Sequence, residues 1–105
     1  MLLDEVDPAA ELPVARVRAG DELQRGDALN LLDFVEWLED QGYEPEAKVT
    51  QKGELSLRGG IIDLFPPTSP WPVRLEFFGD ELESLREFDP ITQVSRSETT
   101  EVMLP

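Results

Sequence analysis

The chain has 105 residues, of which 40% are hydrophobic and 30% are charged, a composition typical of one globular domain. It contains neither cysteine nor histidine, which excludes disulfides and thiolate metal sites and argues against nucleophilic triads. No apolar run approaches the roughly 20 residues that span a bilayer, and no signal-peptide pattern opens the chain. We therefore expect a cytoplasmic protein that is not an enzyme, with no cofactor, no metal and no membrane contact.

The charge is strongly one-sided. Nine basic residues stand against 23 acidic ones, which gives a formal net charge of −14. Such a field repels phosphate backbones, so we expect no direct binding to nucleic acid. An acidic surface most often serves solubility. The alternative interpretation is that it faces a basic partner and that the few arginines have particular roles.

The N-terminal part of the chain predicts a lead-in followed by a strand. Residues 1–11 are acidic and contain Pro8-Ala9-Ala10, which indicates a flexible segment. The remaining residues, 12–105, are interpreted as a single domain. Apolar residues alternate with others over Leu12–Arg18 and predict a strand there.

One main helix is predicted over Ala28–Gln41. Asp27 precedes it as a suitable N-cap, and Gly42 follows it as a residue that tolerates the left-handed conformation at a helix end. The apolar residues of this segment recur at helical spacing: Leu31, Leu32, Val35 and Leu38.

Short strands with turn signals follow the helix. Lys52-Gly53 predicts a hairpin between Ala47–Gln51 and Glu54–Arg58. Gly59-Gly60 predicts a bulge or bend before a strand over Ile61–Phe65. A phosphate-binding loop at these glycines is not expected, because a β-branched pair rather than a helix follows them.

A second hairpin is predicted at Gly79-Asp80, with Phe78 facing Glu81. Strict alternation beyond this turn would point Leu85 outward. We therefore expect a bulge near Glu83–Ser84 that returns Leu85 to the core.

Ile91–Met103 is expected to add one or two edge strands. The predicted fold class is α+β, with a small antiparallel or mixed sheet and one main helix. The acidic pairs on the second hairpin are interpreted as a solvated surface rather than a catalytic or metal site.

The outward face of the sheet carries the candidate binding residues. In Trp71–Phe78, alternation places Arg74, Glu76 and Phe78 on one face. The same rule points Arg58 outward from Glu54–Arg58 and turns the leucines of that strand inward. If the two strands are neighbours, the four side chains form one patch. Arginine beside an exposed aromatic is the composition of an interface hot spot.

A structural alternative stays open for the same residues. The arginine and the glutamate could form a cross-strand pair, with Phe78 covered by the helix or by the acidic N-terminus.

Two motifs carry a resemblance to a known family. They are Gly-Glu-Leu-Ser-Leu-Arg-Gly-Gly-Ile-Ile-Asp-Leu-Phe-Pro-Pro at 53–67 and Pro-Val-Arg-Leu-Glu-Phe-Phe-Gly-Asp at 72–80. They resemble the UvrA-binding module shared by the bacterial transcription-repair coupling factor (Mfd) and the excision-repair helicase UvrB. Arg58-Gly59-Gly60, Pro66-Pro67 and the run Phe88–Gln93 look more like the coupling factor.

The resemblance implies a fold like that of UvrB domain 2 and a role in transcription-coupled nucleotide excision repair, with UvrA as partner. It implies that Arg58, Arg74 and Phe78 contact UvrA, and Glu76 matches the acidic residue of the same motif. Alanine at each of the first three is expected to leave folding nearly intact. Alternatives are the UvrB version of the domain, or a module that other domains of a parent protein mask. The parent family is an ATP-dependent DNA translocase, but this chain shows no P-loop or acidic helicase motif.

Overall fold

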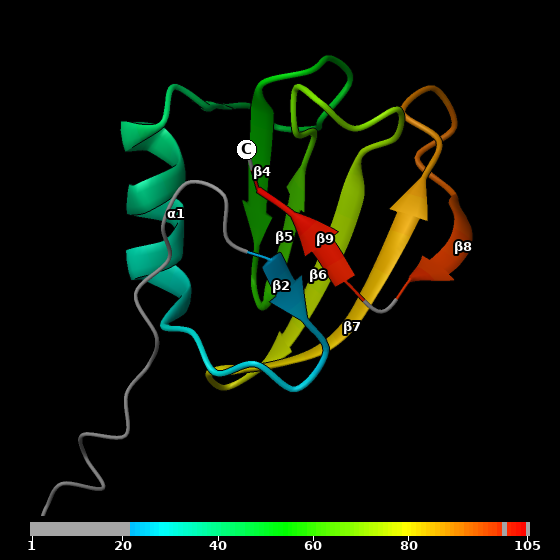
Figure 1. Ribbon diagram of the computed structural model, residues 1–105. Coiled ribbons are helices and arrows are strands. Elements are labelled where there is room, and N and C mark those ends of the chain that lie inside the picture. Colours follow the sequence, from blue (N-terminus) through cyan, green and yellow to red (C-terminus); the bar gives the residue numbers. More distant parts are fainter. Residues whose placement is uncertain (1–21, 100, 105) are drawn as a thin grey trace, which may run out of the picture.

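A six-stranded sheet, a two-stranded sheet and one helix make up the part of the chain that the computed structural model describes, residues 22–99 and 101–104 (Figure 1). The large sheet has the order β3-β4-β5-β6-β7-β8. Its strands are β3 (Glu44–Pro45), β4 (Glu54–Arg58), β5 (Ile61–Leu64), β6 (Val73–Phe78), β7 (Glu81–Phe88) and β8 (Ser95–Thr99). All neighbours are antiparallel except β3 and β4, which are parallel. The predicted α+β class is confirmed.

The helix α1 (Leu31–Asp40) and the small sheet of β2 (Glu22–Gln24) and β9 (Glu101–Met103) cover the same face of the large sheet (Figure 1). Between these layers lies the main core, which takes apolar residues from every layer: Leu23, Phe34, Leu38, Ile62, Leu75, Leu85 and Val102 among others. The opposite face of the large sheet is the one that carries the predicted binding residues. Among the described residues, no helix is long and apolar enough to cross a membrane.

The helix begins three residues later than predicted. Its N-cap is Asn30, whose side chain accepts a hydrogen bond from the Asp33 backbone N–H at 3.0 Å. Asp27 instead accepts from the Gln24 backbone N–H at 2.8 Å, and Ala28 forms a β-bridge with Glu81. Pairing with the tip of the β6–β7 hairpin therefore keeps this segment out of the helix. The helix ends at Asp40, one residue before the predicted Gln41, which is its C-cap. The predicted left-handed stop at Gly42 is confirmed by its φ of 99°.

The predicted hairpin between Ala47–Gln51 and β4 is wrong. Instead, β4 pairs with β5, and Gly59-Gly60 is the two-residue turn between them rather than a bulge. The segment before β4 is a loop, because the Glu54 carboxylate accepts hydrogen bonds from the backbone N–H groups of Thr50 and Gln51, at 2.9 and 3.0 Å. The Thr50 bond is the main cause that lowers the pKa of Glu54. Hydrogen bonds from the loop backbone to the Glu54 side chain therefore take the place of the expected backbone pairing between two strands.

The second hairpin agrees with prediction. Phe78 pairs with Glu81, and the register shifts so that Glu76 pairs with Ser84. Glu83 is therefore the extra residue of a bulge, and Leu85 is buried.

The strands predicted near the two ends of the chain agree with the structure only in part. β8 lies at the edge of the large sheet as expected, whereas β9 pairs with β2 rather than with that sheet. The predicted strand Leu12–Arg18 and the lead-in 1–11 lie outside the described residues.

Candidate functional site

The predicted binding residues lie on the face of the large sheet opposite α1, but on strands that are not neighbours. Arg58 ends β4, whereas Arg74, Glu76 and Phe78 belong to β6, and β5 lies between these strands. The condition that the two strands are adjacent is therefore wrong. Asp63 lies on the intervening strand β5 and is the Cα partner of Arg74.

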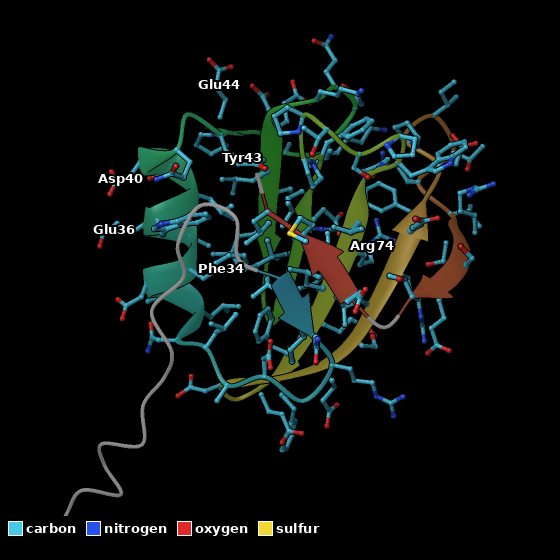
Figure 2. The ribbon with its side chains drawn as sticks, in the orientation of Figure 1. Phe34, Glu36, Asp40, Tyr43, Glu44 and Arg74 are labelled. Atoms are coloured by element: carbon cyan, nitrogen blue, oxygen red, sulfur yellow. The ribbon has the colours of Figure 1, made fainter. Side chains whose placement is uncertain are left out.

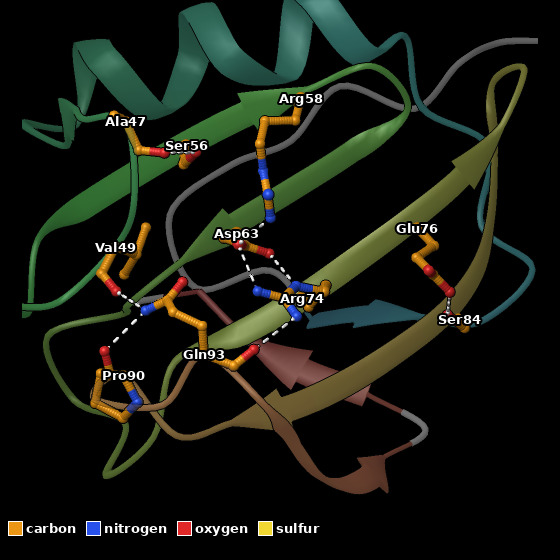
Figure 3. A network of polar contacts seen from close by, with 10 residues as sticks. All are labelled: Ala47, Val49, Ser56, Arg58, Asp63, Arg74, Glu76, Ser84, Pro90 and Gln93. Carbon is orange, nitrogen blue, oxygen red and sulfur yellow. Dashed lines mark hydrogen bonds and ion pairs between the residues drawn. The ribbon is translucent and has the colours of Figure 1, made fainter.

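Asp63 joins the two arginines (Figure 3). Its side chain is 1% exposed, and its carboxylate accepts from Arg74 Nε at 2.8 Å and from Arg74 Nη2 at 3.0 Å. Arg58 Nη2 lies 3.4 Å from the same carboxylate. A bidentate guanidinium pair of this kind fixes the arginine in position and direction.

Arg74 is mostly committed to contacts inside the domain. Its guanidinium lies 4.4 Å from the centre of the Phe88 ring, and Nη1 donates to the Gln93 carbonyl at 3.2 Å. Only 16% of its side chain is exposed. The hydrogen bond to Asp63 is the main cause that raises the pKa of Arg74, so this side chain stays charged.

This arrangement corrects one expectation. Alanine at Arg74 would leave the buried Asp63 carboxylate without its main partner, so folding would not stay nearly intact. Sequence reasoning did not single out Asp63. The available signal was a single carboxylate in the otherwise apolar run Ile61–Phe65.

Arg58 and Phe78 are the open residues of this face. The Arg58 side chain is 59% exposed, and its hydrogen bond to Asp63 is long. Phe78 is 74% exposed, so the prediction that the helix covers it is wrong. The acidic N-terminus, the other cover considered, lies outside the described residues. The other part of the alternative, an Arg–Glu pair, also does not form: Glu76 instead accepts from the Ser84 hydroxyl at 2.6 Å.

The strand register sets the size of the patch. Arg58 pairs with Ile61, which pairs with Glu76, so Arg58 and Glu76 are two strands apart, or about 10 Å. Phe78 lies two residues further along β6, about 7 Å from Glu76. These distances fit within one standard interface of about 800 Å² per partner. We call Arg58, Glu76 and Phe78 the open patch.

The open face of the sheet carries charges of both signs. Arg86 is the Cα partner of Arg74 and of Glu98, so three arginines share this face with three carboxylates: Asp63, Glu76 and Glu98. On the other side, Glu36 and Asp40 point away from the sheet along the outer surface of α1 (Figure 2). No group of three or more carboxylates suited to a metal ion occurs in the part of the chain that the structure describes. The exposed Arg58 and Phe78 side chains of the open face suit a partner surface that offers a carboxylate and an apolar pocket.

Comparison with known proteins gives a family and close relatives. The sequence model of the UvrB interaction domain matches residues 22–105. The transcription-repair-coupling factor of Staphylococcus aureus (strain USA300) is 42% identical over 80 residues, which cover 76% of this chain. The protein of the same name from Staphylococcus haemolyticus is 42% identical over 82 residues, or 78% of this chain. The match spans only 7% of the length of either relative. The chain belongs to the UvrB interaction domain family.

Proposed function

We propose that this chain is a protein-interaction module that binds UvrA through the open patch and thereby recruits it in transcription-coupled nucleotide excision repair. The observation that carries the proposal is the exposure of Phe78 at 74% on the same face as the exposed Arg58, in a member of the UvrB interaction domain family. The relatives that are coupling factors favour transcription-coupled repair over the UvrB version of the domain.

The exposed Phe78 side chain contributes little to folding, because most of it stays in water. Exposed aromatic and arginine side chains are, however, the anchors that most often dominate binding free energies. The patch is also held ready for binding. Phe78 is the last residue of β6, next to the tight turn at Gly79, and Glu76 is fixed by Ser84. A surface ordered in advance loses less entropy when a partner binds.

Calorimetric titration of UvrA into this domain tests the proposal. Phe78→Ala and Arg58→Ala should each weaken binding at least about tenfold, because truncating a hot-spot residue typically costs 2 kcal/mol or more. Both residues are exposed, so the variants should keep the stability of the parent domain.

A matched control lies on the other side of the large sheet. Leu32 on α1 is also an exposed apolar residue, at 68%. Leu32→Ala should bind UvrA like the parent domain. If folded Phe78→Ala and Arg58→Ala also bind like the parent, the open patch is not the binding site.

A further inference from the structure

We propose that Asp63 is a positioning residue for partner binding: it holds Arg58 and Arg74 in place from beneath the face without touching the partner. The inference rests on the proposed function and adds a residue that the sequence motifs did not assign. At 1% exposure, the Asp63 side chain is too buried to be contacted by another protein.

The Asp63 carboxylate contacts the guanidinium groups of both arginines. One oxygen accepts from Arg74 Nε, and the other accepts from Arg74 Nη2 while also facing Arg58 Nη2 (Figure 3). Two guanidinium groups that share one face repel each other unless a negative charge lies between them. The Asp63 carboxylate supplies that charge, and it also defines where the otherwise exposed Arg58 side chain rests.

The same carboxylate is linked to the loop at the other end of the face. Arg74 Nη1 donates to the Gln93 carbonyl, and Gln93 Nε2 donates to the carbonyls of Val49 and Pro90. Gln93 has a φ of 66°, a strained value that these contacts hold in place. Asp63 therefore lies at the centre of a network that orders the face before a partner arrives.

Removing the charge should weaken binding through Arg58. Without Asp63, the long Arg58 side chain must lose its rotamer freedom at the moment of binding, which corresponds to about two- to tenfold in affinity. Asp63→Asn keeps the shape of the side chain and removes its charge, so we expect an affinity loss in this range. The loss should be smaller in an Arg58→Ala background, because the arginine that Asp63 positions is then absent.

The experiment is calorimetric titration of UvrA into the parent domain, Asp63→Asn, Arg58→Ala and the double variant. Val102→Ala serves as a control for lost stability, since Val102 is buried in β9 on the far side of the sheet. At a temperature where circular dichroism shows all variants folded, Val102→Ala should bind like the parent.

Four results would overturn the inference. Parent-like binding by Asp63→Asn would refute positioning alone, and so would additive losses in the double variant. No binding of UvrA to the parent domain would refute the proposed function as well. If Asp63→Asn does not fold, Asp63→Glu replaces it in the experiment, because it keeps the charge but moves it by one methylene. Asp63→Glu should then bind UvrA more weakly than the parent domain. Parent-like affinity of Asp63→Glu would refute the inference.

Discussion

Replacing Arg74 by alanine should destabilise the domain strongly, although the residue belongs to the predicted binding face. The substitution removes both hydrogen bonds to Asp63, at 2.8 and 3.0 Å, the bond to the Gln93 carbonyl and the contact with the Phe88 ring. Removing one partner of a buried ion pair typically costs 3–5 kcal/mol. Arg58 remains 3.4 Å from the same carboxylate, so we expect the lower end, about 3 kcal/mol.

Urea unfolding followed by circular dichroism at neutral pH measures this loss. Arg86→Ala is the matched control, because Arg86 is the neighbour of Arg74 on β7 and makes no ion pair with the described residues. It should cost at most about 1 kcal/mol. Replacing Asp63 and Arg74 together by leucine should recover most of the loss, since apolar residues often substitute for a buried pair without cost. A loss below about 1 kcal/mol for Arg74→Ala would refute the role given to this pair.

Three further predictions concern single residues outside the open patch. Burial raises the pKa of Tyr43, and its hydroxyl has no hydrogen-bond partner among the described residues. Tyr43→Phe should therefore leave the free energy of unfolding unchanged or raise it by about 1 kcal/mol. A clear loss of stability in urea unfolding would contradict this. A Cβ at Gly60 would lie 2.8 Å from the Phe77 carbonyl oxygen. Gly60→Ala should therefore lower the free energy of unfolding by about 1–3 kcal/mol. Unchanged stability would contradict this, because β6 would then move aside without cost. The pKa of Glu54 is lowered, so its ionised form stabilises the loop above the ordinary value of 4.5, and this contribution is lost as the pH falls through the lower folded value. The amide resonance of Thr50 should therefore titrate with a midpoint below pH 4.5. A midpoint above pH 4.5, or the same titration in Glu54→Gln, would contradict the assignment.

Local signals in the sequence predicted the second hairpin and its bulge. The turn at Gly79-Asp80 fixes the pairing of Phe78 with Glu81, and the need to bury Leu85 then requires an extra residue. The end of the helix was equally local, because a glycine such as Gly42 accepts the left-handed conformation at a helix end without strain. Such features depend on neighbours in the sequence and can be predicted from it.

The errors came from contacts that periodicity does not show. The start of the helix depends on Ala28 pairing with the distant Glu81. The loop before β4 depends on a local contact, in which the Glu54 carboxylate accepts from backbone N–H groups three and four residues before it. Alternation correctly placed Arg74 on the outer face, but it could not show that Asp63 on the intervening strand buries most of that side chain. Periodicity predicts the face on which a residue lies, whereas strand order decides its neighbours.

The central claim is that UvrA binds the face of the large sheet that carries the open patch. Addition of unlabelled UvrA, in less than equal amount, to the ¹⁵N-labelled domain tests it residue by residue. Amide signals of Arg58, Glu76 and Phe78 should lose intensity first, and those of α1 should be retained longest. Loss centred on α1, or no loss at any residue, would contradict the account.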